Sequence, residues 1–115
     1  MEIKIVKNQI KREELQKLAQ EQFGDLIKIV VDIEKEIMAV GGELHADEEV
    51  ALMEEDSKRE NTWGINFYPG KSKEEWIEFD SIINIKPSYG NRSRGVDNPE
   101  IRKKIGEIVE KLVVN

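Results

Sequence analysis

The spacing of apolar residues changes period along this chain, and that change restricts the fold more than any other feature. Apolar side chains alternate with polar ones at 3–6, 63–68 and 75–86, as in a strand with one buried face. They recur every three or four residues at 12–22 and 98–112, which is typical of a helix that packs by one side. A chain with both periods has to pack strands against helices.

Helices are predicted in three places. The first covers 12–22 and ends before Gly24, a common helix stop. The last has Asn98 as its N-cap and Pro99 at its first position. Between them a helix begins at 45–49, where acidic residues suit the positive end of the helix dipole, and it frays by 56–57. Its buried side is predicted to contain Val50, Ala51, Leu52 and Met53.

Residues 25–40 fit both helical spacing and strict alternation. Their β-branched residues favour two strands, 27–33 and 37–40, joined by a turn at 34–36 that contains neither glycine nor asparagine. A second hairpin is predicted from 63–68 and 75–86. The predicted order is β-α-β-β-α-β-β-α. It indicates a single α+β domain over residues 1–115, with a mostly antiparallel sheet of about five strands and the helices packed on one face.

Composition excludes several classes of function. The net charge is −6 and the pI is near 4.9, which argues against nucleic acid as a partner. The chain has no cysteine and no Gly-rich phosphate loop, so no cofactor is predicted. There is no signal peptide pattern and no apolar stretch of the roughly 20 residues that span a bilayer, so we expect a soluble cytoplasmic protein without membrane contact. Charged residues make up 37% of the chain, and their Glu- and Lys-rich pattern is typical of thermophile proteins.

The first candidate site surrounds the only histidine. Glu43, His45 and Asp47 are spaced two residues apart, and in an extended segment this spacing points all three side chains to one side. They could then bind a divalent metal ion, or a carboxylate could orient the imidazole for proton transfer. In the structural alternative, Asp47 is a helix N-cap, His45 bonds to backbone and Glu43 is solvated. This alternative carries more weight, because one histidine without a diagnostic ligand pair is a weak signal.

The second candidate site is the loop Asn91-Arg92-Ser93-Arg94, with Lys86 beside it. Two guanidinium groups, a hydroxyl group and backbone amides before a helix favour an anion. Residues 86–104 contain six basic and two acidic residues, whereas 36–60 contain nine acidic and two basic ones. This separation of charge could reflect pairing within the chain, association between chains or one polarised binding face. The simpler alternative is that both segments are solvated helix faces.

A further polar pair lies in the predicted strand 75–86, where Asp80 and Asn84 would share a face. If that face is buried, Asp80 is a candidate site residue and needs a partner, which Arg92 or Arg94 could supply. If that face points to solvent, the pair does not indicate a site. The two tryptophans are predicted to pack in the core rather than to stack on bases.

Four short motifs stand out together: GGELHAD at 41–47, WGIN at 63–66, INIKP at 83–87 and GNRS at 90–93. As a set they resemble a family of small prokaryotic proteins classed as a domain of unknown function. The resemblance extends over nearly the whole chain and implies a single α+β domain. Because that family has no assigned activity, the resemblance implies no catalytic or binding residue. The family pattern has a glycine in the turn at 34–36, where this chain has Glu36.

The leading hypothesis is a non-enzymatic module. It would bind a small anionic ligand or a protein partner through Lys86 and the 91–94 loop. A structural alternative is a self-associating protein, in which the acidic middle of one copy meets the basic C-terminal region of another.

An enzymatic alternative is a small hydrolase or phosphodiester-cleaving enzyme. His45 would act as acid and base, and Glu43 or Asp47 would orient it or hold a metal ion. Arg92 or Arg94 would stabilise the developing negative charge. This hypothesis requires the two candidate sites to share one cleft.

Overall fold

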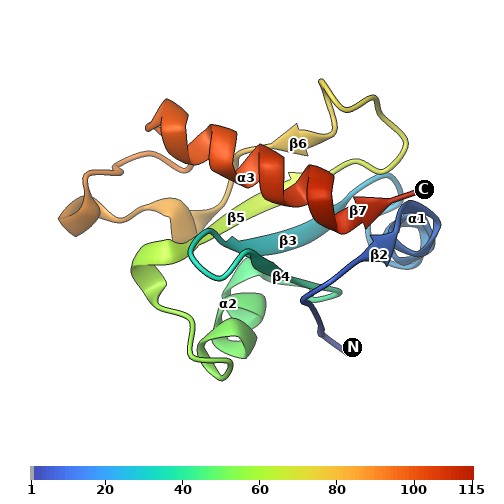
Figure 1. The fold of residues 1–115 in the computed structure, drawn as a ribbon, viewed down its shortest axis with the longest axis horizontal. Helices are drawn as coiled ribbons and strands as arrows, with labels where there is room; N and C mark the ends of the chain where they lie inside the picture. Colours follow the sequence, from blue (N-terminus) through green and yellow to red (C-terminus); the bar gives the residue numbers. More distant parts are fainter. Residues whose placement is uncertain (1) are drawn as a thin grey trace.

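A five-stranded antiparallel sheet lies at the centre of the structure, a computed structural model that describes residues 2–115 (Figure 1). Every neighbouring pair of strands in this sheet is antiparallel. The prediction of an α+β domain with a mostly antiparallel sheet of about five strands is therefore confirmed. In spatial order the strands are β1 (Lys4–Val6), β4 (Ile37–Val40), β3 (Ile27–Asp32), β5 (Thr62–Phe67) and β6 (Ile77–Glu78).

Helices cover both faces of this sheet. α1 (Arg12–Gln22) and α3 (Pro99–Leu112) pack on one face, and α2 (His45–Met53) packs on the other (Figure 1). The predicted packing of all helices on one face is wrong. The central strand β3 is apolar on both sides, because Ile27, Ile29 and Val31 join the larger core while Val30 joins the cluster under α2. A strand buried on both faces needs cover on both.

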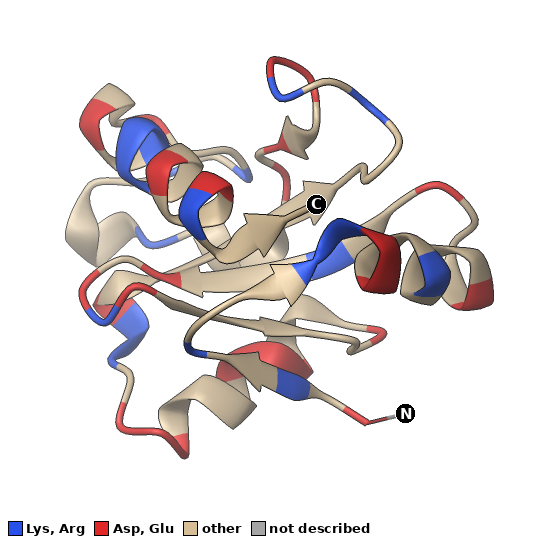
Figure 2. Ribbon diagram, turned by 45° about the vertical axis from the view of Figure 1, so that its right-hand side comes forward, with Lys and Arg blue, Asp and Glu red and all other residues tan. Residues whose placement is uncertain are grey.

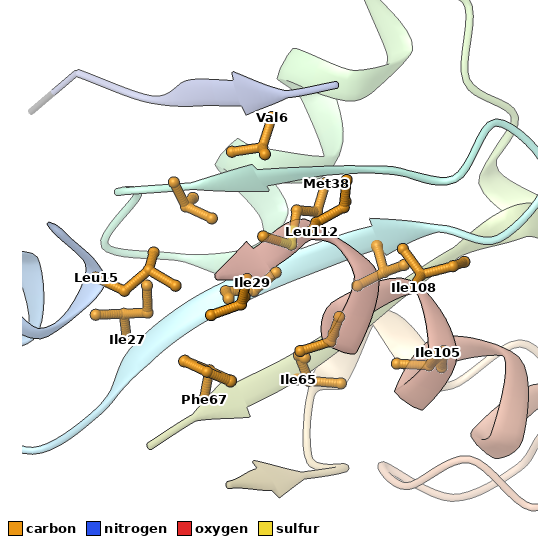
Figure 3. Close-up of a cluster of buried hydrophobic side chains, with 14 of the residues drawn as sticks. Val6, Leu15, Ile27, Ile29, Met38, Ile65, Phe67, Ile105, Ile108 and Leu112 are labelled. Carbon is orange, nitrogen blue, oxygen red and sulfur yellow. The ribbon is translucent and has the colours of Figure 1, made fainter. Parts of the chain in front are cut away.

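The larger core lies between the sheet and the helices α1 and α3 (Figure 3). Leu15 of α1 and Phe67 of β5 are fully buried in it. Both tryptophans are buried, as predicted, and the ring of Trp76 lies 4.9 Å from that of Phe67. The buried stripe of α3 consists of Ile105, Ile108, Val109 and Leu112.

A small second sheet was not predicted. In it β2 (Ile10–Lys11) pairs in parallel with β7 (Val113–Val114). Since β2 directly precedes α1 and β7 directly follows α3, this pairing ties the start of one helix to the end of the other.

The predicted positions of the helices are confirmed. α1 covers 12–22, and α3 follows Asn98, whose side chain accepts a hydrogen bond from the backbone N–H of Glu100 at 2.9 Å. α2 begins at His45, with Leu44 rather than Asp47 at the N-cap position. Among residues 2–115 we find no helix long and apolar enough to cross a membrane.

The turn between β3 and β4 forms without a glycine. Glu36 has a φ of 56°, in the left-handed region that favours glycine. One carboxylate oxygen of Asp32 accepts hydrogen bonds from the two backbone N–H groups before Glu36, at 2.8 and 3.0 Å. Lys111 and Lys104 of α3 bond the Glu36 carboxylate and lower its pKa. Hydrogen bonds and ion pairs from side chains therefore stabilise this turn. A glycine at position 36 would have avoided the backbone strain.

The predicted strand 75–86 is wrong beyond its first part. Only Ile77 and Glu78 pair with β5. Ser81 then begins a helical turn, since its Oγ accepts a hydrogen bond from the backbone N–H of Ile83 at 3.3 Å. Asp80 therefore shares no strand face with the residues that follow. Short 3-10 helices are η1 (Arg59–Asn61), η2 (Ile82–Asn84) and η3 (Pro87–Tyr89).

The predicted buried side of α2 is largely wrong. Val50 and Met53 are 56% and 47% exposed, whereas Glu48 and Glu49 are buried. Glu48 accepts a hydrogen bond from the backbone N–H of Gly42 at 3.0 Å. Glu49 accepts one from the hydroxyl group of a β5 residue at 2.7 Å. These partners allow two acidic residues to replace the apolar side chains that the spacing had placed inside.

Candidate functional site

A pocket of about 290 Å³ lies on the face of the sheet that α2 covers. Its wall includes the N-terminal end of α2, residues of β3 and β5, and the segment that contains η2. We call it the α2 pocket. It brings together three residues singled out in the sequence, His45, Asp80 and Arg94. The complete lining is Lys28, Leu44, His45, Ala46, Asn66, Asp80, Ser81, Ile82, Ile83 and Arg94.

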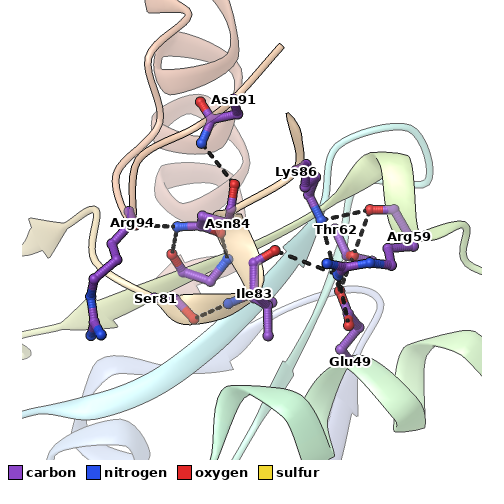
Figure 4. Close-up of polar contacts among 10 residues, drawn as sticks. Glu49, Arg59, Thr62, Ser81, Ile83, Asn84, Lys86, Asn91 and Arg94 are labelled. Atoms are coloured by element: carbon purple, nitrogen blue, oxygen red, sulfur yellow. Dashed lines mark hydrogen bonds and ion pairs between the residues drawn. The ribbon is translucent and has the colours of Figure 1, made fainter. Parts of the chain in front are cut away.

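Gly64 of β5 lies beside this pocket, at the point where three distant segments meet. The side-chain amide of Asn84 accepts a hydrogen bond from the N–H of Gly64 at 2.8 Å and donates one to its C=O at 2.9 Å. The same amide donates to the backbone C=O of Arg94 at 3.0 Å (Figure 4). A Cβ atom on Gly64 would lie 2.6 Å from the Cβ atom of Ser81 and 3.1 Å from Cγ of His45. Only a glycine leaves room for this approach.

His45 is buried and electrically neutral near pH 7. Its Nε2 lies 2.7 Å from the backbone oxygen of Ile65, which can only accept, so Nε2 carries the proton and donates it. Burial lowers the pKa of the ring to about 4, and the charges of Lys28 and Arg94 act in the same direction. The ring therefore offers an unprotonated Nδ1 near neutral pH and has no second proton to give.

The charged groups that line the pocket are two cations and one carboxylate. The Arg94 side chain is 54% exposed, and its Nε donates to Asp80 at 2.7 Å. Arg94 is one of the two arginines that the sequence offered as a partner for a buried Asp80, but here both side chains of the pair are about half exposed. Lys28 projects from β3, with its ammonium nitrogen 5.4 Å from the ring centroid of Phe23. Within residues 2–115 it forms no salt bridge, although its charge acts on the buried Glu48.

Asn91 of the predicted binding loop is buried and holds the loop together. Its amide nitrogen donates to the backbone oxygens of Asn84 at 2.7 Å and Gly95 at 2.8 Å. Its amide oxygen accepts the backbone N–H of Asp97 at 2.8 Å. These hydrogen bonds, of which Figure 4 shows the one to Asn84, use the side chain to hold the shape of the loop.

Lys86 is also buried, and its partners lie away from the α2 pocket. Its ammonium group donates to the backbone oxygen of Arg59 at 2.8 Å and lies 3.9 Å from Glu49 (Figure 4). It also lies 5.2 Å from the ring centroid of Trp63. Burial is the main cause that lowers its pKa to about 8.

The other predicted site residues lie on the surface, outside the pocket. Arg92 is exposed, and the hydroxyl group of Ser93 donates to Asp97 at 2.7 Å. Glu43 and Asp47 are exposed as well. Because the helix begins at His45, the extended geometry that would align its two acidic neighbours is absent. Among residues 2–115 no group of three His, Asp or Glu side chains could hold a metal ion, so this trio does not converge.

The acidic and basic segments pair partly within the chain. Glu36 bonds Lys104 at 3.1 Å and Lys111 at 2.5 Å. Glu49 lies 3.9 Å from Lys86 of the basic segment, and it also bonds Arg59 of its own segment at 3.1 Å. Pairing within the chain, one of the three explanations for the charge split, therefore accounts for part of it.

Lys28, Asn66 and Ser81 are pocket residues that the sequence reasoning missed. Lys28 and Asn66 are opposite each other on β3 and β5. The amide nitrogen of Asn66 donates to Glu78 at 2.8 Å, while its amide oxygen is buried with no hydrogen bond among the described residues. The available signal was a polar side chain inside each of two apolar strands, IKIVVD and TWGINF.

Fold and site together define a small α+β domain with a charged pocket between its antiparallel sheet and the start of α2. The chain belongs to the family described as "Protein of unknown function (DUF5674)", whose model matches residues 4–112. The resemblance to a family of unknown function is thereby confirmed. A search of curated proteins and a search of solved structures each found no match.

Proposed function

We propose that this domain binds a small organic anion in the α2 pocket. The observation that carries the proposal is the convergence of Arg94, Lys28 and the N-terminal end of α2 on one cavity. Two cations there face the single carboxylate of Asp80, although the whole chain has a net charge of −6. A positive pocket on an acidic protein attracts anions locally while the rest of the surface repels them.

Arg94 is the residue that would contact the negative group. Its Nε bonds Asp80, and among the described residues its two terminal nitrogens have no hydrogen bond. Asp80 thus orients the guanidinium group and leaves its outer edge free. That edge can form two parallel hydrogen bonds with a carboxylate or a phosphate. Each hydrogen bond to a charged group contributes about 1.5–3 kcal/mol.

The remaining lining indicates an apolar part on the same ligand. Leu44, Ala46, Ile82 and Ile83 contribute apolar atoms to the pocket. The volume of about 290 Å³ is at the small end of the range for ligand pockets. A short carboxylic acid with an aliphatic or aromatic group fits this combination of size, charge and lining.

The hydrolase hypothesis has less support. His45 and Arg94 do line one pocket, as that hypothesis requires. However, with a pKa of about 4 the ring is a weak base near neutral pH, and its only proton is bonded to the Ile65 oxygen. Glu43 and Asp47, the groups that would orient the ring or hold a metal ion, lie outside the pocket.

The test compares Arg94→Gln with Arg92→Gln. Both variants remove one positive charge from the same loop, but only Arg94 lines the pocket. The probes are inorganic phosphate, butyrate and benzoate, with benzamide as the uncharged match of benzoate, and the readout is the rise in melting temperature. We expect an anion to stabilise the wild type and Arg92→Gln and to leave Arg94→Gln unchanged. An equal response of both variants, or an equal response to benzamide, would overturn the proposal.

A further inference from the structure

The imidazole ring of His45 has one hydrogen-bond acceptor without a partner. Its Nε2 donates to the backbone oxygen of Ile65 at 2.7 Å, so Nδ1 is the nitrogen with the free lone pair. Among residues 2–115 no hydrogen bond reaches Nδ1. The fully buried polar atoms without a hydrogen bond include Oδ1 of Asn66 but not Nδ1 of His45, so Nδ1 keeps contact with open space. Because His45 lines the α2 pocket, a molecule in that pocket can reach this acceptor.

The position of this acceptor is fixed by the surrounding structure. A Cβ atom on Gly64 would lie only 3.1 Å from Cγ of His45, so the ring packs directly on the backbone of β5. Turning the ring about its axis would break the hydrogen bond to Ile65. An acceptor that is already held in place loses little freedom when a ligand binds, which favours a ligand with a donor opposite it.

The charges around the ring favour a neutral donor over a cationic one. Figure 2 shows acidic and basic residues distributed over the whole ribbon, so the balance at the ring itself decides. The charged groups that act on the ring are Lys28, Asp80 and Arg94, and Asp80 is already bonded by Arg94 at 2.7 Å. The exposed Glu43 and Asp47 belong to the same end of α2, but they do not line the pocket or act on the ring. An ammonium group at Nδ1 would therefore meet more positive than negative charge, whereas a hydroxyl group would not.

We propose that the ligand of the α2 pocket is a hydroxy acid, which places its carboxylate on Arg94 and donates its hydroxyl hydrogen to Nδ1 of His45. This inference rests on the proposed function, because it requires the anion to bind in the same pocket. The carboxylate accepts from the terminal nitrogens of Arg94, and the hydroxyl group supplies the donor that Nδ1 lacks. A site that hydrogen-bonds a hydroxyl group rejects the analogue without it, because the polar group of the site is then left unpaired. His45 is thus a residue that determines specificity.

The first test compares butyrate with its 2-, 3- and 4-hydroxy derivatives by isothermal titration calorimetry near neutral pH, with 2-aminobutyrate as the acid that carries a cationic donor. We expect one hydroxybutyrate to bind the wild type at least about tenfold more tightly than butyrate, and 2-aminobutyrate to gain nothing. If butyrate binds but no hydroxybutyrate binds more tightly, this inference is refuted while the proposed function stands. An equal gain from 2-aminobutyrate would refute the neutral donor. If none of these acids binds, the proposed function fails, and this inference fails with it.

Two variants test whether His45 is the source of the preference. His45→Gln keeps an amide nitrogen that can donate to Ile65 but has no acceptor in the place of Nδ1. The ratio of the dissociation constants of butyrate and the preferred hydroxybutyrate should therefore fall to about one. The matched control is Ile82→Ala, which shortens an apolar side chain of the same pocket and should keep the ratio. An unchanged ratio in His45→Gln, or an equal fall in the control, would refute the contact.

The same contact can be observed without a substitution, because the chain has a single histidine. A long-range ¹H–¹⁵N NMR spectrum of the free protein should show a protonated Nε2 and an unprotonated Nδ1. The preferred hydroxybutyrate should move the Nδ1 resonance toward that of a protonated nitrogen, since Nδ1 then accepts a hydrogen bond, and butyrate should not. A proton on Nδ1 in the free protein, or the same shift with both acids, would overturn the inference.

Discussion

Gly64 offers the most direct test of how the site is built. Its φ lies outside the left-handed region, so alanine is compatible with the backbone, and in an open strand it would stabilise the fold by about 0.5–1 kcal/mol. Here the added Cβ would lie 2.6 and 2.7 Å from Cβ and Oγ of Ser81 and 3.1 Å from Cγ of His45. We therefore expect Gly64→Ala to lower the free energy of unfolding instead, by about 1–3 kcal/mol, as overpacking does.

The neighbours of Gly64 have little freedom to move away. The backbone N–H of Ser81 donates to the C=O of Arg94 at 2.9 Å, which fixes the position of its Cβ. The ring of His45 is held by its hydrogen bond to Ile65. The substitution therefore has to displace one of these bonded groups or distort β5.

The variant Ser81→Gly removes the two closest contacts, so it should lessen the cost of Gly64→Ala. The coupling between the two substitutions should reach at least about 1 kcal/mol in a double-mutant cycle. Urea unfolding followed by the fluorescence of the two buried tryptophans measures all four proteins. The control is Gly106→Ala, because a Cβ atom there has open space and should stabilise α3 by about 1 kcal/mol. If the free-energy changes of Gly64→Ala and Ser81→Gly simply add, the steric explanation is wrong.

Two further predictions concern the stability of the fold. Because the pKa of His45 falls from 6.5 to about 4 on folding, the unfolded chain binds the proton more tightly, and acid should lower the stability of the wild type relative to His45→Gln. This loss of stability should begin as the pH falls below 6.5 and reach about 3 kcal/mol below pH 4. If urea unfolding shows the same dependence on pH for the wild type and for His45→Gln, protonation of His45 is not the cause. Asp56 has a φ of 68° just after α2, so Asp56→Gly should raise the free energy of unfolding by about 1 kcal/mol, whereas a lower melting temperature would contradict the strain argument.

Elements fixed by local signals could be predicted from the sequence. The cap formed by Asn98 and the β-branched run of β3 act within a few residues, so the pattern alone places them. The hairpin at 34–36 was predicted in spite of its missing glycine. Side chains from β3 and α3 compensate for the strain at Glu36, and the β-branched residues of 25–40 had already favoured two strands over a helix.

Elements that depend on distant partners could not be predicted. The buried side of α2 was misassigned because Glu48 and Glu49 are paired by groups that lie outside their helix. The sequence placed the pocket residues in separate candidate sites for the same reason, because only contacts between distant segments bring them together. Arg94 and His45 do line one pocket, whereas the side chain of Asn91 forms hydrogen bonds that hold the loop in shape. No spacing along the chain distinguishes an asparagine that binds a ligand from one that holds a loop.

The amide of Asn84 also has a consequence for the edge of the sheet. Beyond the short strand β6, β5 would present the N–H and C=O of Gly64 as a free template for another strand. The side chain of Asn84 takes up both groups, in the way a residue of a neighbouring strand would. It therefore blocks the addition of a foreign strand at this point, with a single buried side chain in place of the charges or prolines that commonly protect sheet edges against aggregation.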